Sequence, residues 1–147
     1  MGKGTSAGTI VILVLALMIL IVYSLAPAYR DQTSDNPTLG QVRANFSRLD
    51  QKYAKIPLRV GDSAYTENKE VITLCLADPE TNHYYDINTI MYVSLHELAH
   101  VITPEGYAEH GPEFKQNFSN LLRKATEEGI YNPRIPIPAT YCKVKTT

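Results

Sequence analysis

The sequence is poor in cysteine, which excludes one common way of building a small domain. Its 147 residues contain two cysteines, Cys75 and Cys142, too few for a scaffold held together by disulfides. No Cys-x-x-Cys or Cys/His pair occurs near either residue, so a zinc site made from them is not expected. Two unconnected thiols are the default interpretation. One disulfide stays open if the domain lies in an oxidising compartment.

A strong charge of one sign is also missing. The formal net charge is −1, and the nearest approach to a basic cluster is Lys143 with Lys145. A DNA-binding domain would normally show a basic stripe, so a nucleic-acid partner is not expected. No internal repeat or low-complexity segment occurs. Hydrophobic residues make up 44% and charged residues 20% of the chain, a balance that favours one globular domain with attachments.

Charge is absent between Lys3 and Arg30, and residues 10–23 are an unbroken apolar run. With its uncharged flanks the run reaches the ~20 residues that a bilayer demands, and it has no polar face. We therefore expect residues 1–28 to form one transmembrane anchor, with residues 8–26 in the bilayer. The expected location is single-pass in a membrane, of a host cell or of a virion.

Two other interpretations of the N-terminus stay open. Residues 26–28, Ala-Pro-Ala, resemble the cleavage site of a signal peptide, although the apolar run is long for one. The first six residues fit the N-myristoylation pattern, with Gly2 as acceptor. The two flanking charges leave the orientation in the membrane open.

The rest of the chain has the patterns of a small α+β domain. Residues 29–38 are polar and turn-rich and are expected to form a linker, and residues 39–147 the domain. Thr38 with Gln41 resembles a capping box that opens a helix ending near Pro57. The apolar residues of this helix recur at spacings of four, three and four: Val42, Phe46, Leu49 and Tyr53.

Short strands and two further helices follow. Residues 58–66 and 70–76 are strand candidates joined by a turn, which predicts a hairpin. Asp86 is a suitable N-cap for a helix over about 87–102. A second helix opens at Gly111-Pro112 and ends at Gly129, and an extended tail over 130–147 is expected to pack on the domain.

The chemistry is indicated by His-Glu-Leu-Ala-His at residues 96–100, inside the helix predicted from Asp86. Residues four apart lie on one helix face with Cβ atoms about 5–6 Å apart, so His96 and His100 can bind one zinc. Glu97 lies on the flank, where it can reach a water on the metal. The opposite face is an apolar stripe expected in the core: Met91, Leu95, Leu98 and Ile102.

A catalytic zinc needs a third protein ligand and one open position. The metzincin pattern would require Gly at position 103 and His at 106, whereas the chain has Thr103 and Gly106. His110, ten residues after His100, is the favoured third ligand, and His83 is expected on the surface. Carboxylates that compete for the third position are Glu105, Glu109, Glu113 and Glu127.

His-Glu-Leu-Ala-His, a short loop and then His-Gly-Pro-Glu-Phe at 110–114 together resemble the SprT-like and WLM group of HExxH zinc metallopeptidases. The resemblance covers about residues 58–125. It implies a minigluzincin-like α+β fold, a small zincin-like domain with a short β-hairpin or sheet and an active-site helix, here preceded by the transmembrane helix. It also implies three zinc ligands and one catalytic acid/base, namely His96, His100 and His110, with Glu97.

The chain departs from that group in its apolar N-terminus and in lacking the basic and zinc-finger additions of the DNA-repair proteases. It is also similar to predicted metallopeptidases of large DNA viruses. We expect a membrane-anchored, zinc-dependent metallopeptidase that hydrolyses a protein or peptide substrate with a metal-activated water, and Tyr107 is a candidate donor to the oxyanion. The alternative is a non-catalytic membrane or virion structural protein that retains a zinc site. A DNA-associated protease is a third idea.

Overall fold

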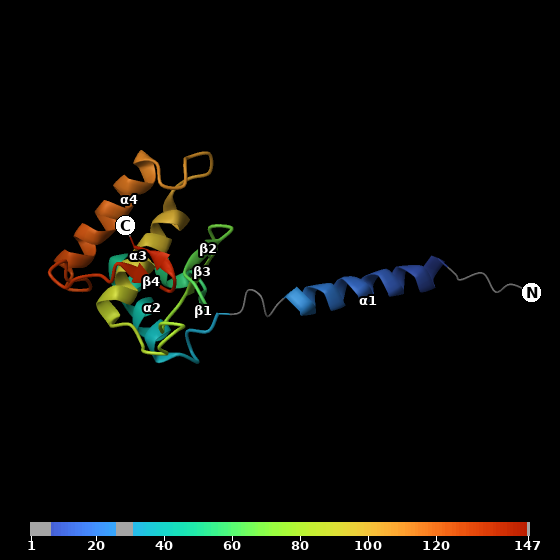
Figure 1. Cartoon of the computed structure of the whole chain (residues 1–147). Helices are drawn as coiled ribbons and strands as arrows, with labels where there is room; N and C mark the ends of the chain where they lie inside the picture. The colour runs from blue at the N-terminus through green and yellow to red at the C-terminus, as the bar shows by residue number, and fades with distance from the viewer. Residues whose placement is uncertain (1–6, 26–30, 147) are drawn as a thin grey trace, which may run out of the picture. The chain divides into compact units, whose positions relative to one another are not determined.

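The computed structural model describes residues 7–25 and 31–146, and the chain divides into two compact units, Met1–Arg30 and Asp31–Thr147 (Figure 1). The first unit contains helix α1, Ala7–Leu25. The described side chains of α1 are exposed and uncharged. The helix contains no Pro, the residue that would interrupt its interior.

The predicted transmembrane anchor over residues 1–28 is contradicted. Within the part of the chain that the structure describes, no helix combines the length and the apolar character needed to cross a membrane. The predicted single-pass membrane location is contradicted by the same finding. Acylation at Gly2 and cleavage at 26–28 concern positions outside the described residues.

The second unit is α+β. Its elements, in chain order, are α2 (Pro37–Leu49), the 3-10 helix η2 (Tyr53–Lys55), β1 (Leu58–Val60), β2 (Tyr65–Glu67), β3 (Val71–Leu74), α3 (Ile87–Ile102), α4 (Pro112–Glu127), β4 (Thr140–Tyr141) and β5 (Val144–Lys145).

The three-stranded sheet has the order β1-β3-β2. The predicted hairpin is confirmed: β2 and β3 are antiparallel, and both turn residues, Asn68 and Lys69, have positive φ. The single strand expected over 58–66 is wrong, because the chain turns after Val60. β1 then pairs parallel with β3 on the opposite edge from β2, and β3 is buried along its whole length.

The N-cap of helix α2 lies two residues before the predicted one. The side chain of Asn36 accepts hydrogen bonds from the backbone N–H groups of Thr38 and Leu39, at 3.0 and 3.1 Å. Pro37 takes the first helical position, where its missing N–H costs nothing. The capping box at Thr38 is therefore wrong, whereas Val42, Phe46 and Leu49 of the predicted apolar face are buried, together with Leu39. The helix ends at Leu49 and not near Pro57, so Tyr53 belongs to η2 instead.

Part of the expected linker contacts the domain. The Asp31 carboxylate pairs with the Arg43 guanidinium at 2.8 Å. The backbone N–H of Gln32 donates to the Leu58 carbonyl at 2.9 Å. Residues 31–36 are thus bound to α2 and to the start of β1.

Helix α3 is the centre of the core. Asp86 caps it as predicted, accepting a hydrogen bond from the Thr89 N–H at 3.0 Å. Met91, Leu95 and Leu98 on its rear face are fully buried, and α4 packs beside it (Figure 1). The helix that carries His96 and Glu97 is therefore held rigidly from behind.

The C-terminal segment forms a small hairpin, β4–β5, which is covalently attached to the sheet region. Cys142, in the hairpin turn, forms a disulfide with Cys75, so the default of two unconnected thiols is wrong. The Tyr141 hydroxyl donates to the Cys75 carbonyl, and the Cys142 N–H donates to the Tyr85 hydroxyl at 3.0 Å. These interactions fix the hairpin to the rest of the α+β unit.

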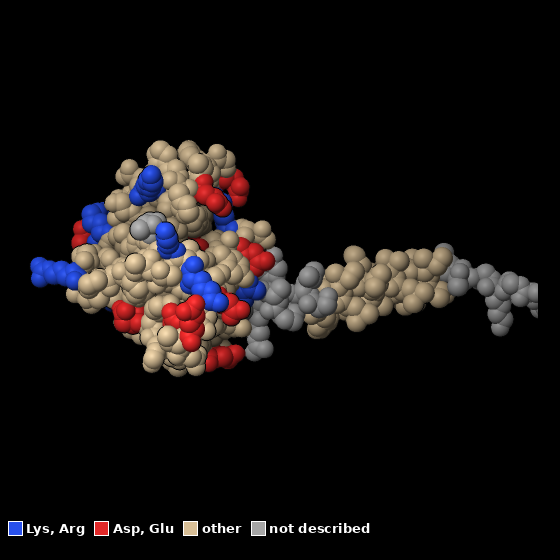
Figure 2. All heavy atoms as spheres, viewed as in Figure 1, with Lys and Arg blue, Asp and Glu red and all other residues tan. Residues whose placement is uncertain are grey.

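Charged side chains of both signs are interspersed on the face of the second unit seen in Figure 2. No broad area of one sign covers that face. Some of the charges form surface ion pairs, such as Arg123 with Glu127 at 2.8 Å.

Candidate metal centre

Helix α3 and the loop after it bring three imidazoles together. The Nε2 atom of His96 lies 3.3 Å from Nε2 of His100 and 3.3 Å from Nε2 of His110. One ring nitrogen of each residue lies within 4.8 Å of the others, close enough to share one metal ion. His96, His100 and His110, predicted as ligands, thus form one cluster.

The loop between α3 and α4 places His110. Gly106 has a φ of +87°, a left-handed conformation that favours glycine, and it lets the chain reverse. Gly111 lies against Ala108, where an added Cβ would come within 3.0 Å of the alanine Cβ. Asn117 of α4 donates to the Thr103 hydroxyl at 3.0 Å and so ties the end of α3 to α4.

Among the described residues, no glutamate belongs to the three-histidine group. The four glutamates considered as alternative third ligands are therefore not part of the group: Glu105, Glu109, Glu113 and Glu127. His83 is exposed on a different segment, as expected.

Phe114 is the aromatic support of the cluster. Its ring centroid lies 4.4 Å from that of His100, 4.8 Å from that of His110 and 4.9 Å from that of His96. The ring is 3% exposed, so it is fixed by the core and restricts all three imidazoles. These three ring contacts explain why the segment over 110–114 ends in Phe.

Burial favours the neutral form of the imidazoles. It lowers the pKa of His96 to about 4, with further lowering from the charges of His100 and His110. Burial also lowers the pKa of His100. Neutral imidazoles keep the lone pair that a metal ligand must offer.

Glu97 lies beside the cluster and is 6% exposed. Burial raises the pKa of its carboxyl to about 7, and a hydrogen bond from Thr66 opposes that rise. The Thr66 hydroxyl lies 2.9 Å from Oε2 of Glu97 and 3.0 Å from the Glu97 backbone carbonyl oxygen. The sequence alone does not indicate that Thr66 contacts Glu97. It predicts Thr66 only as the last residue of a strand.

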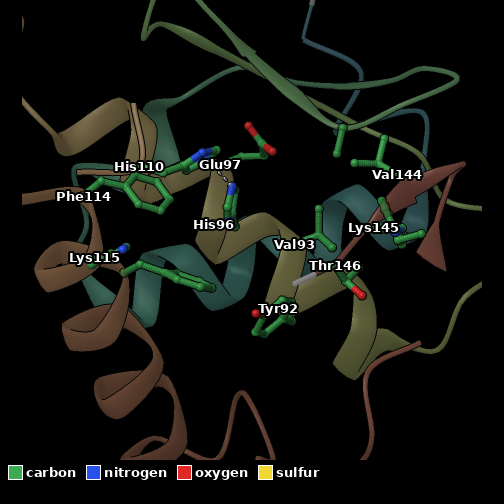
Figure 3. Close-up of a pocket in the computed structure, with 13 residues that line it drawn as sticks. Tyr92, Val93, His96, Glu97, His110, Phe114, Lys115, Val144, Lys145 and Thr146 are labelled. Carbon is green, nitrogen blue, oxygen red and sulfur yellow. Dashed lines mark hydrogen bonds between the residues drawn. The ribbon is translucent and has the colours of Figure 1, made fainter. Parts of the chain in front are cut away.

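Two hollows border the cluster, and His96, Glu97 and His110 line both. One has a volume of about 340 Å³ and extends between α3, α4 and β5 (Figure 3). The other, of about 540 Å³, lies under the loop between the ligands and includes Tyr107, which is 57% exposed. The metal-binding face is therefore open on two sides.

This donor set fits a metal ion. Three neutral nitrogen ligands with open space beside them match the three-ligand, one-open-position arrangement of catalytic metal centres. Imidazole ligands suit zinc, copper, iron and nickel, so the geometry alone supports a transition-metal site without naming the element.

Comparison with known proteins gives relatives from viruses. No protein-family profile matches the chain, and no solved structure is detectably similar to it. It is 37% identical over 91 residues to uncharacterized protein 136R of Invertebrate iridescent virus 6, covering 60% of this chain and 50% of the relative. It is 42% identical over 81 residues to uncharacterized protein 042R of Invertebrate iridescent virus 3, covering 55% and 50%.

A third relative is uncharacterized protein R325 of Acanthamoeba polyphaga mimivirus, which is 40% identical over 83 residues, or 54% of this chain and 41% of the relative. The chain thus spans about half the length of the curated relatives it matches. The resemblance to SprT-like and WLM peptidases remains a prediction, and the established similarity is to these viral proteins.

Proposed function

We propose that the chain is a zinc-dependent metallopeptidase that hydrolyses peptide bonds in a protein or peptide substrate. The observation that carries the proposal is the position of Glu97, a buried carboxylate on the flank of three convergent imidazoles, at the border of two open hollows. A structural zinc site is usually closed by four protein ligands, and it needs neither an open side nor an adjacent carboxylate.

The imidazoles of His96, His100 and His110 would hold the metal through their Nε2 atoms. When bound, zinc would polarise the scissile carbonyl as a Lewis acid and lower the pKa of a water toward 7. Zinc is favoured over other metals that imidazole binds because the spacing His-Glu-x-x-His is typical of zinc peptidases.

We assign to Glu97 the two proton transfers of the reaction. Its Oε2 atom is engaged by the Thr66 hydroxyl, so Oε1 is the atom that takes a proton from the attacking water and delivers it to the leaving amine. Without metal, burial raises the pKa of this carboxyl to about 7, and a nearby cation would lower it. Tyr107 is the candidate donor to the oxyanion, from the wall of the larger hollow.

Replacement of Glu97 by Gln separates metal binding from catalysis. The full chain and the Glu97→Gln variant are loaded with zinc, measured for metal content by mass spectrometry and assayed on unfolded casein. The variant should keep its zinc and lose at least about a hundredfold in rate, the lower range for a general acid–base. Glu80→Gln, at an exposed position away from the site, is the matched control.

Hydrolysis that persists in Glu97→Gln would remove Glu97 from the mechanism. A wild-type chain that binds zinc but cleaves nothing would support the alternative of a non-catalytic protein with a structural metal site.

A further inference from the structure

The smaller hollow is lined mainly by apolar side chains. Val93 and Tyr92 of α3 and Phe114 and Phe118 of α4 contribute to its wall. The ring of Phe118 lies 5.3 Å from that of Tyr92 and 5.2 Å from that of His96, centroid to centroid. An apolar wall therefore begins in contact with a metal-ligand candidate and leads away from it.

The hairpin β4–β5 forms the opposite wall. Figure 3 shows Val144, Lys145 and Thr146 across the hollow from Phe114 and His110. The disulfide in the hairpin turn fixes this wall to the sheet region. The hollow is therefore a preformed cavity between two fixed walls.

The charges in this hollow are asymmetric. Among the described residues that line it, Glu97 is the only carboxylate, and the exposed side chains of Lys115 and Lys145 also contribute to the lining. An incoming lysine or arginine side chain would lose water against an apolar wall, and Glu97, the only carboxylate among the described lining residues, is already assigned to the reaction. An aromatic or long aliphatic side chain would instead replace water against apolar surface.

We propose that this hollow is a specificity pocket, which selects peptide bonds flanked by a large apolar or aromatic residue. Its volume of about 340 Å³ lies within the range of small-molecule sites, and it borders Glu97, so its occupant belongs to a residue next to the scissile bond. The proposal rests on the proposed peptidase function and adds the substrate class.

The preference is first measured on a peptide mixture. The zinc-loaded full chain is incubated with peptides from a bacterial proteome digested after glutamate, and the new termini are read by mass spectrometry. Phe, Tyr, Leu or Met should be enriched at one position next to the cleaved bond, and Lys and Arg depleted there. Synthetic peptides with Phe, Ala or Lys at that position should then differ in kcat/KM by at least about tenfold between Phe and Ala.

Val144, which lines both hollows, tests whether strand β5 shapes the pocket. It is 57% exposed on β5, so substitution does not disturb the core. Val144→Trp should fill the hollow and lower kcat/KM for the Phe peptide by at least about tenfold. The ratio of kcat/KM for the Phe peptide to that for the Ala peptide should then fall. Val144→Ala should widen the pocket and favour a Trp peptide over the Phe peptide. Val60→Trp changes another exposed strand valine away from the hollow and should alter neither ratio.

The experiments distinguish failure of the pocket inference from failure of the proposed peptidase function. Cleavage of the mixture with no apolar enrichment, or a Phe-to-Ala ratio unchanged in Val144→Trp, would overturn the pocket and leave the peptidase intact. No cleavage of any peptide by a zinc-loaded chain would overturn both.

Discussion

At the scale of single residues, the proposed chemistry depends on a contact from outside the motif helix. Thr66, on strand β2, holds Oε2 of Glu97 at 2.9 Å. The hydrogen bond fixes the rotamer of a carboxylate that must transfer protons at a defined position. Thr66 is thus a positioning residue, which touches the proposed acid/base and is not itself assigned a bond to substrate.

Thr66→Val should lower kcat by about ten- to a hundredfold with KM and zinc content nearly unchanged, the effect expected of a lost supporting hydrogen bond. Thr66→Ser, which keeps the hydroxyl, should restore most of the rate. Thr140→Val, at an exposed strand threonine, is the control. An unchanged rate in Thr66→Val, or a loss in Thr66→Ser as large as that in Thr66→Val, would contradict the role assigned to the hydroxyl.

The contrast between Glu97 and Thr66 shows which site residues the sequence could predict. His96, Glu97 and His100 lie within one helical turn, so spacing alone places them together. Thr66 reaches Glu97 across 31 residues of chain, through a strand whose limits were mispredicted. Such a contact depends on tertiary packing, for which a single sequence carries no periodic signal.

At the scale of secondary-structure elements, α3 depends on its cap. Burial alone would raise the pKa of Asp86, but hydrogen bonds from the Thr89 hydroxyl and backbone N–H hold it below its usual value of 3.8. A lowered pKa in the folded state means that the carboxylate stabilises the fold above the unfolded pKa. This contribution is lost as the pH falls through the folded value.

Asp86→Ala should therefore reduce the free energy of unfolding by about 1 kcal/mol at pH 7, the usual cost of a lost N-cap. The difference from wild type should shrink below about pH 4, as the wild-type carboxylate is protonated. Chemical denaturation at pH 7 and at pH 3 measures both values. Asp62→Ala, at an exposed loop position, should have little effect, and a pH-independent difference for Asp86→Ala would contradict the assignment.

The hairpin β4–β5 depends on its disulfide. Cys75 and Cys142 are 67 residues apart in sequence, so the bond restricts the unfolded chain substantially. The double variant Cys75→Ala/Cys142→Ala should lose about 2–4 kcal/mol of unfolding free energy. A phosphine reductant should destabilise the wild type and leave the double variant unchanged. A wild type that is insensitive to reductant would show that the two thiols are not joined.

The sequence predicts some of these elements better than others. Helices α3 and α4 were placed correctly because their start signals, Asp86 and Gly111-Pro112, are local. The strand expected over 58–66 divides into β1 and β2 because the parallel pairing of β1 with β3 is non-local. The pairing of Cys75 with Cys142 likewise depends on the tail folding back over the sheet region.

At the scale of the whole molecule, the chain consists of an apolar helical unit and an α+β unit that contains the complete candidate site. The apolar N-terminal run suggested a membrane span that the described helices do not support. By contrast, the α+β unit combines local helix signals with a motif of fixed spacing, and its helices α3 and α4 and the clustering of His96, His100 and His110 agree with the prediction.

The central claim is that one zinc ion binds to imidazoles from adjacent turns of α3 and from the loop that follows. A crystal of the zinc-loaded full chain, measured on both sides of the zinc absorption edge, tests it most directly. We predict one anomalous peak per chain, at about 2.0–2.1 Å from a nitrogen of each of His96, His100 and His110. The peak should vanish in His110→Ala and persist in His83→Ala. A zinc peak elsewhere, or none at these three imidazoles in the wild type, would contradict the account.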